Sequence, residues 1–302
     1  METFTFNGKE GQILSAAKYT VENPKAVFQI VHGIAEHKER YQPFCAFLQK
    51  NGYSVYIHDH RGHGGSVGKA VGYTAEKNGW QLMVDEIRIL TDIIRKENPN
   101  LPLFLFGHSM GSFLVRTYAI QNSDYLDGLI VCATGGPLPL LSFVGHNLAK
   151  LQKAFLGGLK TGHLINKLSL GGYEKAYGGL CWLTRDPAVV EEYSRDELCG
   201  FVPTLSLFEN LLYGTRFTNK KKNIAKMRKD LPVLFIAGDG DPVGSFGKGV
   251  TKVYKMFAEA GIKDLEYKLY PEARHELLNE TNKDEIFNDI LNWLNSRTKE
   301  KK

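Results

Sequence analysis

One pentapeptide, Gly107–Gly111, contains a residue whose type and setting could make it a nucleophile, Ser109. The apolar run Leu103–Phe106 precedes it, and helix-forming residues follow it. This G-x-S-x-G pattern, placed between a strand and a helix, is typical of a sharp turn that presents a serine hydroxyl at the edge of a sheet. Gly107 and Gly111 would relieve the backbone contacts of such a turn. We therefore predict that Ser109 is a catalytic nucleophile.

A serine hydroxyl is a weak nucleophile unless a base removes its proton and an acid orients that base. Suitable residues follow two apolar runs further along the chain: Asp239 and Asp241 follow one run, and His275 follows the next. The loops after neighbouring parallel strands meet at one edge of a sheet, so these side chains can lie beside Ser109. We expect His275 to be the base and Asp241 to orient it, with Asp239 as the competing acid.

Acyl transfer also requires N–H donors for the negatively charged oxygen of its tetrahedral intermediate. The amide of Met110, directly after the serine, is one candidate because of its place in the turn. A second donor would come from the loop after the apolar run 27–31, where Gly33 allows a close backbone approach and Ile34 offers its amide. We predict an oxyanion hole formed by the backbone amides of Ile34 and Met110.

The elements that position these residues can be predicted from hydrophobic patterning. Apolar runs flanked by glycine and proline predict strands at 3–6, 13–19, 26–31, 54–58, 103–107, 128–133, 233–237 and 265–270. Helical patterns predict helices at 41–51, 80–96, 109–122, 251–260 and 284–297. Several of the strand runs are continuously apolar, as in parallel sheets buried on both faces. The alternation predicts an α/β fold with a mostly parallel central sheet flanked by helices, preceded by an N-terminal hairpin.

Residues 137–230 interrupt this alternation. They show helical patterns and glycine-rich joints but no convincing strand, and their first half is rich in leucine. We predict a helical cap at 137–230, inserted between two strands of a core formed by residues 1–136 and 231–302. The apolar first half of the cap suggests a tunnel for an acyl chain, although the same side chains could instead bury the cap against the core.

Composition limits the class of protein further. Of 302 residues, 43% are hydrophobic and 24% are charged, and the longest apolar runs are too short to span a membrane. The four cysteines form no C-x-x-C pair and the N-terminus does not resemble a secretion signal, so we expect a cytoplasmic protein with reduced thiols. The net charge is only +5, with basic residues concentrated at 216–229. We expect a solvated surface there and no nucleic-acid partner, while contact with an anionic lipid surface stays open.

Together these motifs resemble the α/β-hydrolase superfamily, and within it the group of monoglyceride lipases, lysophospholipases and serine aminopeptidases. The resemblance extends almost from end to end, and it is carried by His32–His37, Asp59–Ser66, Gly107–Gly111, Asp241–Val243 and Arg274–Glu276. It implies the α/β-hydrolase fold with a helical lid over the serine. Two residues depart from the family pattern, because Ala35 and Ser112 stand where glycine is common.

The favoured function is therefore serine ester hydrolysis through an acyl-enzyme, and the resemblance implies a monoacylglycerol or a lysophospholipid as the substrate. We expect a small ester or lipid as the partner, with neither a cofactor nor a metal. A transient contact between the cap and a membrane surface is left open.

Three alternatives remain at this point. Peptide hydrolysis from the N-terminus would need an acidic pair in the cap, for which Glu191 and Glu192 are the candidates. A non-catalytic binding protein could keep the same fold. The run His58–His63 approximates the H-x-H-x-D-H ligand pattern of binuclear metallohydrolases, but glycine occupies the aspartate position and the resemblance makes this run a structural loop. We expect packing or surface roles for His108 and His163.

Overall fold

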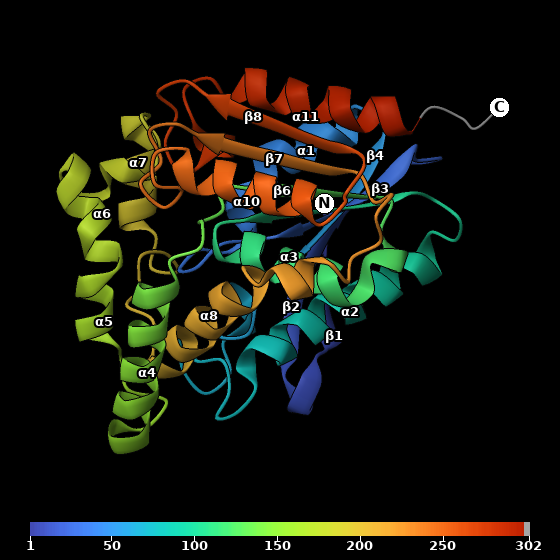
Figure 1. Cartoon of the computed structure of the whole chain (residues 1–302). Coiled ribbons are helices and arrows are strands. Elements are labelled where there is room, and N and C mark those ends of the chain that lie inside the picture. Colours follow the sequence, from blue (N-terminus) through green and yellow to red (C-terminus); the bar gives the residue numbers. More distant parts are fainter. Residues whose placement is uncertain (299–302) are drawn as a thin grey trace.

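The computed structural model describes residues 1–298 and is built around an eight-stranded sheet (Figure 1). Its strands are β1 Glu2–Asn7, β2 Ile13–Tyr19, β3 Ala26–Val31, β4 Tyr53–His58, β5 Leu103–His108, β6 Gly128–Cys132, β7 Val233–Gly238 and β8 Leu265–Tyr270. They lie in the order β1-β2-β4-β3-β5-β6-β7-β8. β1 and β2 form an antiparallel hairpin, β2 pairs antiparallel with β4, and the strands from β4 to β8 are parallel. The predicted fold class, a mostly parallel α/β sheet, is confirmed.

Helices cover both faces of this sheet. One face carries α1 Gln42–Lys50 and α11 Lys283–Arg297, and the other carries α2 Gly79–Glu97, α3 Met110–Asn122 and α10 Lys248–Glu259. Every residue of β3, β4, β5, β6 and β7 is buried, which explains why these strands read as continuous apolar runs. Among the described residues, no helix combines the length and the apolar character needed to cross a membrane.

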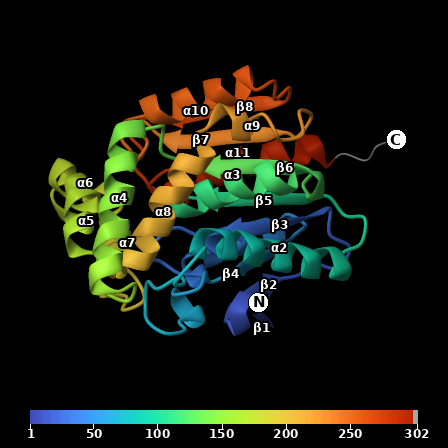
Figure 2. The same cartoon turned by 60° about the horizontal axis from the view of Figure 1, so that its bottom comes forward.

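Between β6 and β7, helices replace strands. They are α4 Pro139–Leu156, α5 His163–Leu168, α6 Leu170–Tyr177, α7 Pro187–Arg195, α8 Leu205–Thr218 and α9 Lys221–Ile224. We call residues 137–230 the cap. The group from α4 to α7 stands at one end of the sheet in both views, and α8 connects it to the core by packing against both α4 and α3 (Figure 2). The exact limits of the cap stay a prediction.

The cap leaves much of its apolar surface uncovered. The exposed large apolar residues along α4, α5 and the adjoining loops are Leu138, Leu140, Leu141, Phe143, Val144, Leu151, Phe155, Leu156, Leu159, Leu164 and Leu168. On α4, Ala149 is the residue that is fully buried. Packing of the cap against the core therefore buries few of the apolar side chains in the leucine-rich segment.

Candidate active site

The turn from β5 into α3 holds Ser109 in a strained backbone conformation. Its φ is +52° and its ψ is −119°, a combination that costs free energy for a residue with a β-carbon. A β-carbon at Gly111 would overlap the carbonyl of Val31, and one at Gly107 would overlap the carbonyl of Gly111, so both positions require glycine. Ser112, one of the two departures from the family pattern, donates its hydroxyl to the Ser109 carbonyl at 2.5 Å.

Ser109, His275 and Asp241 form an unbroken line of contacts. The Ser109 Oγ lies 2.8 Å from Nε2 of His275, and Nδ1 of the same ring lies 2.9 Å from Oδ2 of Asp241. Asp241 follows β7 and His275 follows β8, so adjacent strands bring the two side chains to the serine. Asp239 is exposed and accepts the amide of Glu272 instead, which separates it from the histidine.

The surroundings of His275 favour a basic imidazole. Burial by itself would lower the pKa of His275, but the charge of Asp241 and the hydrogen bond to it raise this pKa above the ordinary histidine value. The second oxygen of Asp241 accepts the amide of Val243 at 2.8 Å, which fixes the carboxylate. The indole of Trp182 lies over the imidazole, with 5.1 Å between ring centroids. This arrangement suits a general base that takes a proton from a hydroxyl.

The loop after β3 lies directly against the serine. A β-carbon on Gly33 would be 3.2 Å from the β-carbon of Ser109. Ile34 and Met110 both line the cavity in front of the serine, and Met110 is the first residue of α3, where helix amides are free to bind an anion. Ala35, the other departure from the family pattern, adopts a left-handed conformation with φ +54°. The loop therefore keeps the shape that favours glycine even though alanine occupies this position.

A buried ionic network lies behind this loop. Arg40 donates from both terminal nitrogens to Glu276 at 2.7 Å and from Nη1 to Glu36 at 3.0 Å. Glu36 in turn accepts the Gly33 amide at 2.5 Å. Because Glu276 directly follows His275, the network joins the loop after β3 to the loop that carries His275. Both glutamates fall within motifs that stand out in the sequence, but Arg40 does not, since a partner 236 residues away leaves no local signal.

The histidine-rich run at 58–63 is a buried structural loop. Within it, Arg61 donates to Glu86 at 3.0 and 2.5 Å, and Asp59 accepts Nζ of Lys38 at 2.8 Å. Across residues 1–298, the histidines of this run do not belong to a group whose ligand atoms converge as metal ligands do. The loop thus anchors the segments on either side of it.

A cavity of about 1170 Å³ lies between the cap and the core. Ser109 and His275 lie on its core side. The cap contributes mainly apolar lining, including Leu138, Leu140, Phe143, Leu148, Leu180 and Leu212. The volume exceeds the roughly 300–1,000 Å³ usual for pockets that bind drug-sized molecules. The site therefore has room for a long apolar group beside the serine.

Other residues singled out in the sequence lie apart from the serine or support its surroundings. Glu191 and Glu192 are exposed on α7 and do not line the cavity, and His163 is exposed at the start of α5. The structure therefore does not bring the acidic pair toward the serine. His108 is buried and lines the cavity, with its ring centroid 4.8 Å from that of His275.

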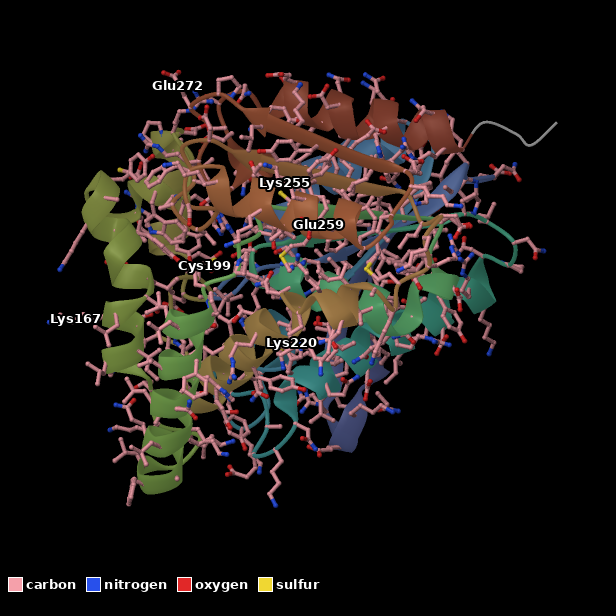
Figure 3. The ribbon with its side chains drawn as sticks, in the orientation of Figure 1. Lys167, Cys199, Lys220, Lys255, Glu259 and Glu272 are labelled. Carbon is pink, nitrogen blue, oxygen red and sulfur yellow. The ribbon has the colours of Figure 1, made fainter. Side chains whose placement is uncertain are left out.

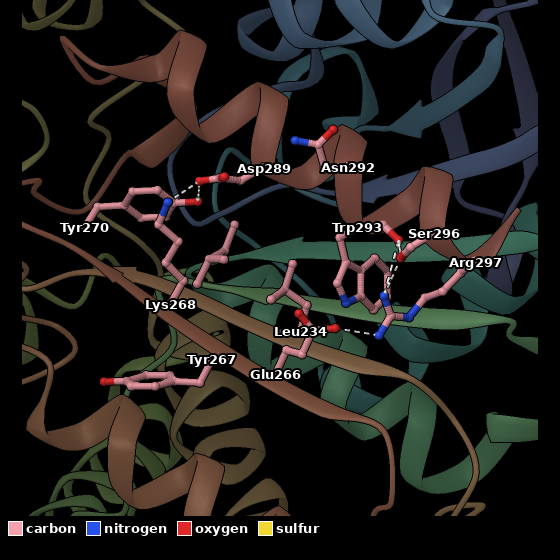
Figure 4. Close-up of a pocket in the computed structure, with 11 residues that line it drawn as sticks. Leu234, Glu266, Tyr267, Lys268, Tyr270, Asp289, Asn292, Trp293, Ser296 and Arg297 are labelled. Atoms are coloured by element: carbon pink, nitrogen blue, oxygen red, sulfur yellow. Dashed lines mark hydrogen bonds and ion pairs between the residues drawn. The ribbon is translucent and has the colours of Figure 1, made fainter.

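A second cavity of about 440 Å³ lies between β8 and α11 (Figure 4). Its charged groups pair with one another or with neighbouring side chains. Lys268 contacts Asp289 at 2.5 Å, and Arg297 contacts Glu266 at 2.6 Å. The hydroxyl of Tyr270 donates to Asp289 at 2.8 Å. These pairs hold α11 against the edge strand β8, so we assign them a structural role.

Comparisons with known proteins agree with this architecture. The model of the family described as serine aminopeptidase, S33, matches residues 22–282. A monoacylglycerol lipase of Mycolicibacterium smegmatis is 28% identical over 90% of this chain and 89% of its own length. A monoglyceride lipase of Saccharomyces cerevisiae is 30% identical over 89% and 84%, respectively. A solved carboxyl esterase of Bacillus coagulans, in complex with glycerol, has a TM-score of 0.92 at 28% identity and covers 98% of both chains.

Proposed function

The chain belongs to the serine aminopeptidase S33 family and is a carboxylic-ester hydrolase, and we propose that Ser109, His275 and Asp241 perform the hydrolysis. The observation that carries the proposal is the continuous contact from the serine hydroxyl through the imidazole to the carboxylate, at the wall of an apolar cavity. Such a chain of contacts is the arrangement that activates a serine for acyl transfer.

The proposed reaction has two displacement steps. His275 takes the hydroxyl proton of Ser109 as the oxygen attacks the ester carbonyl, and the amides of Ile34 and Met110 hold the resulting oxyanion. The protonated imidazole then gives its proton to the leaving alcohol, which leaves an acyl-serine. A water molecule, deprotonated by His275, attacks this acyl group, and the returning proton restores the serine as the acid departs.

The proposed substrate is a long-chain ester with a small polar alcohol, such as a monoacylglycerol or a lysophospholipid. The apolar cap lining beside Ser109 supports this class, because it offers a dry surface to an acyl chain. The names of the relatives from Mycolicibacterium smegmatis and Saccharomyces cerevisiae support the same class.

We further propose that residues 137–230 act as a lid that touches lipid surfaces transiently. The exposed apolar side chains of α4 and α5 support this role, as do the exposed lysines among them, Lys150, Lys160 and Lys167. Lys167 projects away from the molecule at the outer side of the cap (Figure 3). Apolar surface combined with basic residues is what interfacial binding to anionic lipid requires. The four free cysteines support a reducing, cytoplasmic location.

Two measurements test the function. A fluorophosphonate probe should label the native protein and leave Ser109→Ala unlabelled, while Ser194→Ala, an exposed serine of α7, should label normally. Activity on p-nitrophenyl esters and monoacylglycerols should rise with acyl length. Ester hydrolysis that survives Ser109→Ala would overturn the nucleophile, and a preference for acetyl over long chains would overturn the lipid substrate. Rapid cleavage of aminoacyl-arylamides without ester hydrolysis would favour the peptidase alternative.

A further inference from the structure

A second cluster of reactive side chains lies at the junction of the cap and the core. His37 belongs to the loop after β3, whereas Asp196 and Cys199 lie between α7 and α8. One ligand atom from each residue lies within 4.8 Å of the other two. His37 and Cys199 are buried and Asp196 is partly buried. Figure 3 shows Cys199 where the cap meets the core.

Both ring nitrogens of His37 are oriented by carboxylates. Nε2 lies 2.7 Å from Oδ2 of Asp196, inside the cluster, and Nδ1 lies 2.6 Å from Oε2 of Glu39, on the opposite side of the ring. Histidines that bind metals commonly donate their other ring N–H to a carboxylate in this way, which fixes the ring and makes the coordinating nitrogen more basic. Glu39 therefore occupies the supporting position of a histidine metal ligand.

We propose that Nε2 of His37, a carboxylate oxygen of Asp196 and Sγ of Cys199 form a binding site for Zn²⁺ or a chemically similar transition-metal ion. Imidazole and thiolate favour such ions over Mg²⁺ and Ca²⁺, which prefer oxygen ligands. Three protein ligands leave the fourth tetrahedral position to water.

Only small side-chain movements are needed to receive the ion. Two ligand atoms each about 2.1 Å from one ion, at a tetrahedral angle, lie roughly 3.4 Å apart. The nitrogen of His37 and the oxygen of Asp196, now 2.7 Å apart, must therefore separate slightly, and Sγ of Cys199 already lies within 4.8 Å of both. The ion replaces two protons, one on Nε2 and one on the thiol, and both leave to solvent.

The consequence of binding would be mechanical and is independent of the proposed hydrolysis. The carbonyl of Ala35, two residues before His37, accepts the hydroxyl of Tyr193 and the amide of Gly200, each at 3.0 Å. The hydrogen bond between His37 and Asp196 already joins the same two segments, and a metal ion would replace it with coordination bonds to His37, Asp196 and Cys199. The cap and the loop after β3 would then resist separation more strongly.

The test uses the full-length protein after treatment with a chelator and desalting. One equivalent of Co²⁺ should bind and give cobalt–thiolate charge-transfer absorption that Cys199→Ser abolishes and Cys181→Ser, a second free thiol, retains. Saturating Zn²⁺ should raise the midpoint of thermal unfolding by about 3 °C or more. Calorimetry in buffers of different protonation enthalpy should report the release of two protons.

A third variant tests the site independently if Cys199→Ser folds poorly. Glu39 is about half exposed, so Glu39→Gln should fold, and it should weaken the metal affinity about tenfold by releasing the imidazole. Cobalt binding without thiolate absorption, absorption that persists in Cys199→Ser, or equal affinity in Glu39→Gln would each overturn the proposal.

Discussion

Arg40 and Glu276 are joined by two parallel hydrogen bonds of 2.7 Å each, which connect the loop after β3 to the loop after β8. Both side chains are almost fully buried. Burial would raise the pKa of the Glu276 carboxyl, but the guanidinium lowers it to about 2. The same guanidinium also faces Glu36, whose pKa burial raises. One cation thus keeps two buried carboxyl groups in place on either side of the proposed catalytic centre.

Arg40→Met should strongly destabilise the protein because it leaves these carboxylates without their cation. We expect a loss of about 3–5 kcal/mol in the free energy of unfolding, measured by urea denaturation. Arg195→Met removes an exposed partner of Glu191 and should change the same quantity by less than about 1 kcal/mol. Equal effects of the two substitutions would contradict the structural role of the buried pair.

Asp241→Asn should lower kcat by about 10⁴-fold, because an amide neither holds the imidazole in the required tautomer nor stabilises its positive charge. Asp239→Asn is the matched control, since this neighbouring aspartate is exposed and bonds a backbone amide instead. Initial rates on one ester, with circular dichroism to verify folding, distinguish the two variants. Similar losses in both would argue against the choice of Asp241.

The pH dependence of kcat/KM should follow the ionisation of His275. The base must be neutral to accept a proton, so activity should rise with pH through the pKa of this histidine. Because Asp241 raises that pKa, the midpoint should lie above the ordinary histidine value of 6.5. In Asp241→Asn the remaining activity should show a midpoint at lower pH. A midpoint that does not move would mean that the carboxylate does not act on the base.

Leu148→Trp should shorten the preferred acyl chain. Leu148 is half-buried on α4 and lines the cavity, so a larger side chain there would fill part of the space proposed for the acyl chain. Rates on butyryl esters should stay near the native value while rates on long-chain esters fall. Leu151→Trp places the same residue on the same helix at a position that is 57% exposed and outside the lining. That control should leave the chain-length profile unchanged.

The buried histidines should make the protein sensitive to acid. Burial lowers the pKa of His58 to about 3 and that of His63 to about 4, and it also lowers those of His32 and His60. These rings are neutral in the native protein, whereas the unfolded chain takes up protons below about pH 6.5. The free energy of unfolding therefore keeps its full value above this pH. It decreases as the pH falls below it, by about 1.4 kcal/mol per pH unit for each ring.

His58→Phe provides the direct measurement. Both ring nitrogens of His58 lack a hydrogen-bond partner among the described residues, and the ring packs edge-on against Phe6, so phenylalanine should fit the site. The variant should gain about 2 kcal/mol relative to the native protein between pH 7.5 and pH 5, because it removes one titrating ring. His163→Gln, at an exposed position, should show no such gain. A constant difference across this pH range would contradict the argument.

Much of the fold could be predicted because burial in a parallel sheet leaves a strong local signal. The strand predicted at 103–107 is apolar along its length, and a glycine-flanked serine follows it. This local pattern was enough to predict the turn that holds Ser109. The predicted helix at 284–297 begins one residue later than the observed α11, a difference usual for helix ends.

The remaining features depend on contacts between distant segments. No pattern near Arg40 indicates that its partner directly follows His275, and only the folded chain places the two side chains together. The surface of α4 was also difficult to predict. Leucine at helical spacing favours burial, but Leu140 and Phe155 are 76% and 81% exposed because the cap borders a cavity and solvent more than it borders the core. A hydrophobic residue specifies a preference for apolar surroundings and does not specify which ones.

The cap begins after β6 and ends before β7, and these two strands are hydrogen-bonded neighbours in the sheet. Because the two strands are parallel, the chain leaves at the carboxyl end of β6 and re-enters at the amino end of β7, so the connection has to cross the sheet. The returning helix α8 packs against α3 and α2 of the core and makes this crossing, so the helices from α4 to α7 can lengthen, shorten or be exchanged while the register of the sheet stays unchanged. The scaffold can thus diversify by replacing the outer helices of the cap, so that new specificities arise while Ser109, His275 and Asp241 stay where they are.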